Sequence, residues 1–311
     1  MNVGGALAAG GAAVVYGTAY VATAIGLDGY SPAGIGVWRG LFGALLLGTA
    51  LMLPALRSQR PRALAPAAMA RLAILGVVGG GLFILAVNAA VDASGATVTA
   101  FVAGLYAVLA AILAIPILGE GLELRTILAL GAALLGTMLL SDLGTTGVDA
   151  VGIGLGLVAA VAFALFLVLS RRWSVRYHLT GATIGLASLS ISALVAAAVA
   201  ARDGTLIPTA PPLHATLAVA WIAVGPGATA AVLVVIGMRR LPARVASLFL
   251  LLNPPTAAAL GFLVLGERLS ASQLAGAVLV LVAIAAASGA LPTRTAFRRS
   301  SRPGSAPPTR S

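Results

Sequence analysis

Two glutamates follow the same dipeptide in a chain that otherwise contains few acids. Glu120 completes Leu-Gly-Glu within "ILGEGLELRTILALG", and Glu267 completes it within "VLGERLSASQLAGAV". A carboxylate between apolar runs can act as a proton site, or it can stabilise the amino end of a helix. The two glutamates lie 147 residues apart in a chain of 311. Because this spacing is close to half the chain, it indicates an internal duplication.

The residue types exclude several other chemistries. The chain has no Cys, and all 19 of its basic residues are Arg. Disulfides, Cys-bound metals, a Walker A loop and a pyridoxal Schiff base each need a residue that is absent. The two histidines, His178 and His214, lie outside or at the edges of apolar runs. We therefore expect no catalytic residue, no metal and no cofactor. A membrane-embedded enzyme would need His, Asp, Cys or Lys in a cluster, and the chain has none.

The composition places the chain in a membrane. Apolar residues make up 60% of it and charged residues 9%, whereas soluble domains carry about a quarter charged residues. Apolar runs of roughly 20 residues, long enough to cross a bilayer, recur from end to end. Ten helices are expected because a lipid-embedded segment must satisfy its own backbone. They lie at about 3–26, 32–53, 70–91, 94–117, 123–141, 149–170, 180–201, 214–237, 242–265 and 271–290.

The arginines indicate how these helices are oriented. With a cytoplasmic N-terminus, Arg202 and Arg268 fall outside and Arg39 lies within a helix. Sixteen fall inside, namely Arg57, Arg60, Arg62, Arg71, Arg125, Arg171, Arg172, Arg176, Arg239, Arg240, Arg244, Arg294, Arg298, Arg299, Arg302 and Arg310. This bias predicts a multi-pass inner-membrane protein with both termini in the cytoplasm. We interpret the net charge of +11 as suited to the anionic surface of the lipid bilayer, which is the expected partner, and we expect no binding to nucleic acid.

The duplication predicts two halves of opposite orientation. Residues 1–142 and 143–291 would each hold five helices, and 292–311 would form a disordered Arg/Pro/Ser-rich cytoplasmic tail. Because five is odd, the second half enters the membrane in the opposite sense. Inverted repeats are a transporter architecture with a substrate site near the midplane. The prediction is therefore a carrier of a small molecule; its oligomeric state stays open, with a monomer as one option.

Each repeat motif is expected to form a tight turn between two helices. Gly119 and Gly266 permit the turn, and Glu120 and Glu267 stand just ahead of the next helix, where the helix dipole favours an anion. In the second copy, Ser270 and Gln273 have the spacing of a capping box. Two interpretations stay open for each glutamate: a capped turn, or a direct transport role as a gate or proton site.

Two longer stretches resemble a known family. "LNPPTAAALGFLVLGERLSASQLAGAVLVLVAIAAAS" (252–288) is similar to the end of an EamA domain, the repeated unit of the drug/metabolite transporter superfamily. "YGTAYVATAIGLDGYSPAGIGVWRGLFGALLL" (16–47) resembles the opening of that domain. Tyr16 stands where the family often has Trp, and Asn253 stands where related exporters often have an acid. The resemblance implies two repeats of five helices and export of a small metabolite such as an amino acid or amine.

Polar side chains inside predicted helices are the functional candidates. Arg39 either lies in a central site or extends to the headgroups. The candidate substrate-binding residues are Tyr16, Tyr20, Arg39, Asn88, Tyr106, Trp221 and Asn253. For the aromatic members, helix packing or an interfacial belt is the alternative. Pro226, Pro254 and Pro255 are expected to interrupt helices eight and nine, either as gating points or as static kinks.

The predicted function is export of a small metabolite by alternating access between inverted repeats. A flippase for lipids or other amphiphiles, or a non-transporting membrane assembly factor on the same fold, is the alternative. Lipid scrambling assays compared with uptake of water-soluble metabolites would distinguish a flippase from a carrier.

Overall fold

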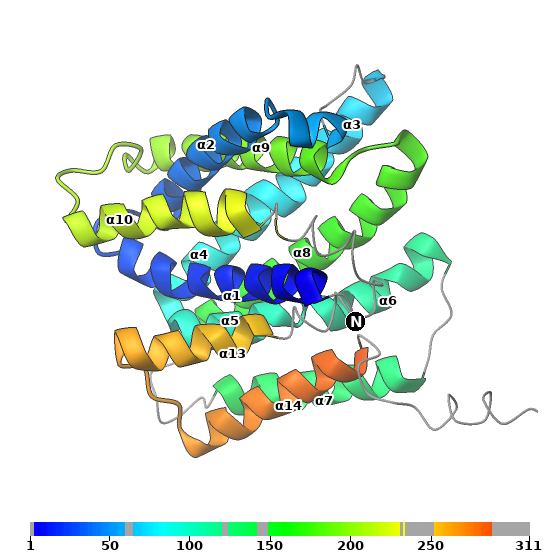
Figure 1. Cartoon of the computed structure of the whole chain (residues 1–311). Helices are drawn as coiled ribbons and strands as arrows, with labels where there is room; N and C mark the ends of the chain where they lie inside the picture. Colours follow the sequence, from blue (N-terminus) through cyan, green and yellow to red (C-terminus); the bar gives the residue numbers. More distant parts are fainter. Residues whose placement is uncertain are drawn as a thin grey trace, which may run out of the picture.

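The computed structural model describes residues 3–59, 65–119, 124–141, 149–230, 233 and 252–287, and every regular element in these ranges is helical. The first half contains α1 (Val3–Gly26), α2 (Pro32–Ala50), η1 (Pro54–Gln59), α3 (Pro66–Leu75), η2 (Gly76–Leu82), α4 (Phe83–Ser94), α5 (Ala96–Gly104), α6 (Tyr106–Leu118) and α7 (Leu124–Ser141). The second half contains α8 (Ala150–Tyr177), α9 (Gly181–Arg202), α10 (Leu213–Ile222), η3 (Ala223–Thr229), α13 (Asn253–Leu260), η5 (Gly261–Leu265) and α14 (Ala271–Ala287). Each of the ten predicted helices is represented by at least one of these segments, which form one bundle (Figure 1). The tail at 292–311 lies outside the described residues.

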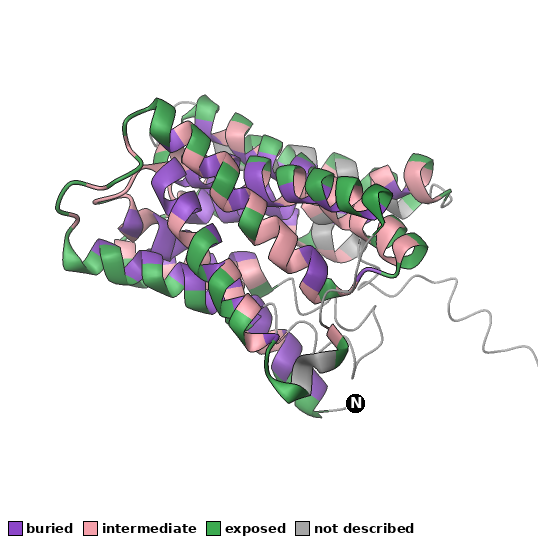
Figure 2. Ribbon diagram, turned by 90° about the horizontal axis from the view of Figure 1, so that it is seen from above, coloured by how far each residue is buried: buried purple, intermediate pink, exposed green. Residues whose placement is uncertain are grey.

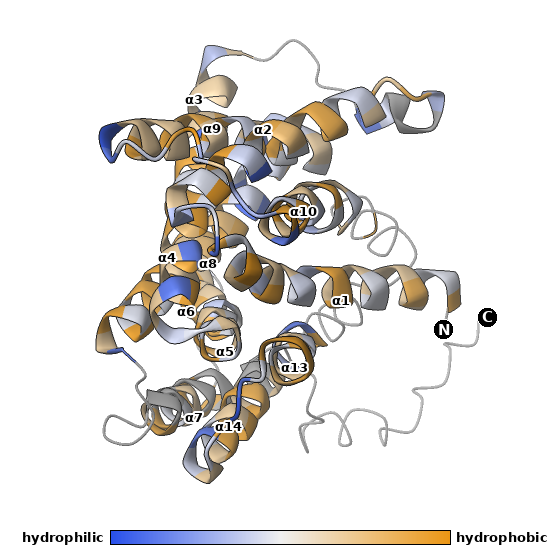
Figure 3. Ribbon diagram, turned by 90° about the vertical axis from the view of Figure 1, so that its left-hand side faces the viewer, coloured by the Kyte–Doolittle hydropathy of each residue, from blue (hydrophilic) through white to orange (hydrophobic). Residues whose placement is uncertain are grey.

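Many of the helices are long and apolar enough to cross a membrane. Six described spans meet that criterion: Val3–Gly26, Pro32–Ala50, Pro66–Ser94, Ala96–Leu118, Ala150–Tyr177 and Gly181–Arg202. Three shorter apolar helices cover Leu213–Thr229, Asn253–Leu265 and Ala271–Ala283. Hydrophobic residues dominate the helices, and most hydrophilic residues lie at helix ends and in connections (Figure 3). The predicted all-α polytopic membrane fold is confirmed.

The two halves repeat each other at the offset of 147 residues. α1 begins at Val3 and α8 at Ala150. The same offset relates α3 to α10, η2 to η3, and the start of α7 to the start of α14. Gly119 and Gly266, the glycines of the two motifs, have nearly the same left-handed conformation, with φ of 73° and 69°. Since φ above zero is strained for other residues, both turns require glycine. The duplication inferred from the motifs therefore extends to the backbone.

The repeats are inverted relative to each other. α1 runs from right to left in Figure 1, whereas its equivalent α8 runs from left to right. At one end of the bundle Asp28 meets His214, and Ser94 donates a hydrogen bond to the Asp149 carbonyl. We call this end, which also holds Glu267, the acidic end. The opposite end carries Arg71, Arg171, Arg172 and Arg176 and is called the arginine end. At the arginine end Arg172 donates to the Ile117 carbonyl, and Thr180 donates to the Gln59 carbonyl.

Small residues let helices of the two repeats approach closely. α2 and η2 pack on α9, α4 and α6 pack on α8, and α7 packs on α14. Buried residues line the inner faces of the helices, while exposed residues face outward (Figure 2). Many of the buried residues are alanines, such as Ala12, Ala159 and Ala200, each 0% exposed. Because lipid tails are as apolar as Leu, association in a membrane depends on such close packing.

Both halves contain a π-helical segment at the same place. η2 has the sequence GVVGGGL and η3 has AVGPGAT. Gly and Pro weaken the regular α-helical hydrogen-bond ladder, and π segments occur frequently at functional sites. Pro226, one of the predicted helix breaks, lies within η3. By contrast, Pro254 and Pro255 occupy the first turn of α13, where a missing N–H leaves no hydrogen bond unmade.

Candidate functional site

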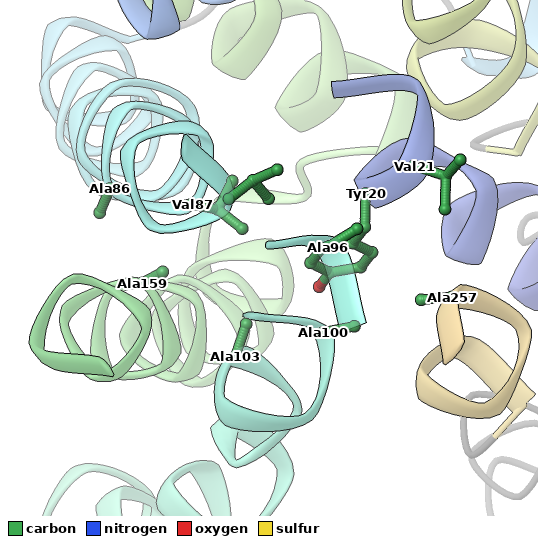
Figure 4. Close-up of a cluster of buried hydrophobic side chains, with 10 residues drawn as sticks. Tyr20, Val21, Ala86, Val87, Ala96, Ala100, Ala103, Ala159 and Ala257 are labelled. Carbon is green, nitrogen blue, oxygen red and sulfur yellow. The ribbon is translucent and has the colours of Figure 1, made fainter. Parts of the chain in front are cut away.

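Four polar side chains of the first repeat lie within electrostatic range of one another; Tyr20 is buried and the other three are partly buried. Tyr16 and Tyr20 are one turn apart on α1, Arg39 lies on α2, and Tyr106 is the first residue of α6. The Arg39 guanidinium interacts electrostatically with both α1 tyrosines. The Tyr106 hydroxyl interacts with those of Tyr16 and Tyr20. Tyr20 points from α1 toward α5 (Figure 4). We call Tyr16, Tyr20, Arg39 and Tyr106 the central polar cluster.

Arg39 provides the charge in this cluster. Its Nε atom is buried and has no hydrogen-bond partner. Among the described acids, Asp28 pairs with His214, while Asp149 and Glu267 accept hydrogen bonds from helix amino ends, so none of these three neutralises Arg39. Arg39 as a whole is only partly buried, but a cation within a predicted span that has no acid partner among the described residues marks a functional position by default. Tyr16 and Tyr20 of α1 lie within electrostatic range of the guanidinium, and its central location stays a prediction.

Helix four, one apolar span from Ala96 to Leu118, changes its hydrogen-bond pattern at Leu105, which keeps right-handed helical backbone. α5 ends at Gly104, the Leu105 N–H turns back to the Val102 carbonyl at 3.1 Å, and α6 begins at Tyr106. In the second repeat α13 begins at Asn253, which is the equivalent of Tyr106 at the 147-residue offset.

The second repeat contributes an aromatic face next to Tyr106. Phe163 on α8 meets the Tyr106 ring edge-on, with centroids 4.9 Å apart. It also stacks on Phe83 at 4.6 Å and on Phe166 at 5.7 Å. We call Phe83, Phe163 and Phe166 the aromatic wall. Sequence reasoning missed Phe163, although it is the repeat equivalent of Tyr16 and that relation was an available signal.

Asn253 brings α13 to the same region. Its Oδ1 atom is buried and unpartnered. α13 packs tightly on α1, since a Cβ atom added to Gly17 would lie 2.9 Å from the Asn253 carbonyl oxygen. This α1–α13 contact is the repeat equivalent of the contact between Phe163 and Tyr106. The region is therefore built by both repeats, with a polar side from the first and an aromatic side mainly from the second.

A family model matches the chain twice. The EamA-like transporter family covers residues 3–142 and 150–289, which is most of the chain and repeats at the same offset of 147 residues. The chain belongs to the EamA-like transporter family. The resemblance noted in the sequence is thus confirmed, and the family consists of transporters, not enzymes. This transporter is a multi-pass membrane protein whose substrate is a small molecule.

Solved structures share the fold. Twenty-five solved chains match significantly. One, described only as a crystal structure of a protein, superposes with a TM-score of 0.65 and 19% sequence identity, covering 97% of this chain and 100% of its own. At that identity the likeness shows the fold alone. Among curated proteins, none matches the transporter significantly.

Two further predicted binding residues, Asn88 and Trp221, donate hydrogen bonds to neighbouring helices. Asn88 is 1% exposed, and its amide donates to the Pro32 carbonyl at 2.9 Å, tying α4 to the start of α2. Trp221 is 44% exposed, and its Nε1–H donates to the Thr18 hydroxyl at 2.8 Å, tying α10 to α1. Both side chains thus connect helices.

Replacing Asn88 with Ala is expected to destabilise the transporter without altering substrate affinity. The Pro32 carbonyl would lose a buried donor and a cavity would form, which together cost about 1–3 kcal/mol. Thermal unfolding of the purified protein measures the first effect, and the KM of transport measures the second. An unchanged unfolding temperature with an altered KM would instead place Asn88 in the binding site.

The glutamate of the second motif connects the two repeats. Glu267 Oε1 accepts the Ala96 N–H at 2.8 Å, and Oε2 accepts the Thr97 N–H at 3.0 Å. These are the first two N–H groups of α5, which follows Gly95 with φ of +78°. The expectation that Glu267 serves the next helix is therefore wrong, because it caps a helix of the other repeat. Glu120 lies outside the described residues.

The next helix, α14, has the predicted capping box. The Gln273 N–H donates to the Ser270 hydroxyl at 3.2 Å, and the Ser270 N–H donates to the Gln273 side-chain oxygen at 3.0 Å. This reciprocal pair satisfies the amino end of α14 locally. The Glu267 carboxylate is therefore free to bind α5.

Proposed function

We propose that this transporter exports a small organic metabolite, of the amino-acid or amine size, by alternating access between its two repeats. The observation that carries the proposal is the meeting of both repeats at the central polar cluster. There Tyr106 of α6 contacts Phe163 of the aromatic wall, and the start of α13 at Asn253 packs on α1 next to Tyr16. In inverted-repeat carriers the substrate binds where the repeats meet, near the bilayer midplane.

At the acidic end the two repeats are joined by polar contacts, which must break before this end can open. Ser31 donates to the Thr205 hydroxyl at 2.9 Å, Asp28 lies 3.0 Å from His214, and Glu267 caps α5. When the substrate site switches from one side of the membrane to the other, these contacts break. The site itself stays between the two repeats. The π segments η2 and η3 lie at equivalent positions of helices three and eight, and they supply weak points at which those helices can bend.

The arginine distribution supports an orientation for this cycle. The arginine end would face the cytoplasm, together with both termini, and the acidic end would face outward. Export then means loading from the arginine end and release at the acidic end.

Reconstituted protein tests the proposal. Purified transporter in liposomes should move at least one member of a panel of water-soluble metabolites, and Tyr106→Leu should reduce that flux about tenfold through loss of a site hydroxyl. Phe262→Leu is the matched control, because Phe262 is 59% exposed and lies far along helix nine from Asn253. Folded protein that moves no metabolite would refute the proposal, and lipid scrambling under the same conditions would identify a flippase.

A further inference from the structure

The described residues of the site carry one positive charge and no negative charge. Arg39 is cationic, and its three neighbours in the central polar cluster are neutral tyrosines. The described acids Asp28, Asp92, Asp149, Asp203 and Glu267 all lie at or near helix ends. The remaining acids, Glu120, Glu123 and Asp142, lie outside the described residues, and the sequence places them between or at the ends of predicted helices. A substrate ammonium would therefore find no carboxylate partner in this region, whereas a substrate anion would find Arg39.

The donors in the cluster suit a carboxylate. Arginine presents a planar fork of N–H groups that matches the two oxygens of a carboxylate, and such charge-assisted bonds are strong. The Arg39 Nε–H is buried and unused within the described structure. Tyrosine hydroxyls donate hydrogen bonds as well, so Tyr16, Tyr20 and Tyr106 can complete the shell of an anion.

The second repeat does not reproduce this polar side. The N-capping residues Ser31 and Thr180 align α2 with α9, which puts uncharged Ser188 at the position of Arg39. On α8, Phe163 and Leu167 take the positions of Tyr16 and Tyr20. The first repeat therefore supplies a cationic side with tyrosine hydroxyls, and the second repeat supplies an aromatic side. The two sides touch where the Tyr106 ring meets the Phe163 ring.

We propose that the substrate is an organic monocarboxylate with an apolar body, its carboxylate held by Arg39 and its body lying on the aromatic wall. Simple amines are not expected as substrates, because the described residues of the site offer a cation and no acid. This inference rests on the proposed transport function for its location, and it narrows the substrate to one charge class.

Three probes that share a phenyl group test the charge class on wild-type protein. Calorimetric titration of detergent-purified transporter with 3-phenylpropionate, phenylalanine and phenethylamine should give the order of affinity in which they are named. The ammonium of phenylalanine offsets the gain from its carboxylate, and phenethylamine has no group for Arg39. Equal or tighter binding of phenethylamine would overturn the proposal, as would failure of 3-phenylpropionate to bind.

Variants at Arg39 test the residue itself. Arg39→Gln should weaken 3-phenylpropionate binding by about 10–100-fold, the loss expected for hydrogen bonds to a charged group. Binding of the neutral 3-phenylpropanol should not change. Arg39→Lys should fall between, because it keeps the charge and loses the fork. Arg202→Gln, at the exposed end of α9, is the control and should match wild type.

The outcomes separate this inference from the proposed function. Arg39-dependent carboxylate binding without any flux in liposomes would refute transport and leave the inference standing. Flux of amines, or a folded Arg39→Gln protein with unchanged carboxylate affinity, would refute the inference and leave transport standing. If Arg39→Gln is not recovered folded, Arg39→Lys and the three-probe series decide the matter.

Discussion

Glu267→Ala is expected to lower the free energy of unfolding of the purified protein by about 2–3 kcal/mol. The carboxylate accepts the Ala96 and Thr97 N–H groups at 2.8 and 3.0 Å, and Ala would leave both without this partner at the start of α5. Because Glu267 and α5 belong to different repeats, the change also weakens the closed acidic end. Thermal unfolding followed by tryptophan fluorescence should show a drop of several degrees.

Asp92→Ala provides the matched control for this loss. It removes one negative charge from the same end of the bundle, but Asp92 is exposed and lies in the last turn of α4, where a carboxylate opposes the helix dipole. Its unfolding temperature should stay the same or rise slightly. Glu267→Gln should lie between wild type and Glu267→Ala, since the amide keeps one acceptor oxygen. Equal stability of Glu267→Ala and Asp92→Ala would show that the cap contributes nothing.

Gly40→Ala is expected to destabilise the protein by about 1–3 kcal/mol or to prevent folding, because it overpacks a tight helix contact. The added Cβ would lie 2.6 Å from the Ala193 nitrogen and 2.7 Å from the Leu189 carbonyl oxygen. Both atoms are backbone of α9, so no side-chain rotation can relieve the overlap. The yield of monodisperse protein and its unfolding temperature measure the effect.

Gly48→Ala on the same helix should have the opposite sign. Nothing lies within 4 Å of a Cβ built on Gly48, so the substitution adds no clash. Ala is a better helix former than Gly, and a gain of about 0.5–1 kcal/mol is expected. If Gly40→Ala were as stable as Gly48→Ala, the α2–α9 contact would be looser than the structure indicates.

The duplicated fold can produce a chemically asymmetric site. Inversion carries Tyr16 to the position of Phe163 and Tyr106 to that of Asn253. The contact of α1 with α13 and the contact of α8 with α6 are therefore equivalent by position but differ in the polarity of their side chains. Among the described residues of this region the cation, Arg39, comes from the first repeat, so a bound substrate would have a defined direction relative to the two repeats.

Local patterns in the sequence predicted the helices well. The first helix was expected at 3–26 and occupies Val3–Gly26, and the capping box at Ser270 forms as predicted. Each depends on residues close in the chain: an apolar run of membrane length, or a side chain that reaches three positions along. The duplication was also visible, because two Leu-Gly-Glu motifs and their offset need no knowledge of packing.

Long-range contacts could not be predicted in the same way. Sequence assigned Glu267 to the next helix, but its carboxylate binds α5, some 170 residues away in the chain. Asn88 and Trp221 ranked equally with Tyr16 as site residues, yet their polar groups are used by Pro32 and Thr18. Composition and periodicity report which residues a helix contains. Which of them face one another depends on how the repeats pack.

Membrane residence, helix count, duplication and inversion thus follow from the amino-acid sequence alone, since hydrophobic length and an odd number of crossings per repeat determine them. The grouping of Arg39 with Tyr16 and Tyr20, and of Tyr106 with the aromatic wall, emerges from the packed bundle. Its physical reason is the close approach of small residues, such as Gly17 against α13 and Gly40 against α9, which sets the rotation and depth of each helix and so selects the side chains that meet at the centre.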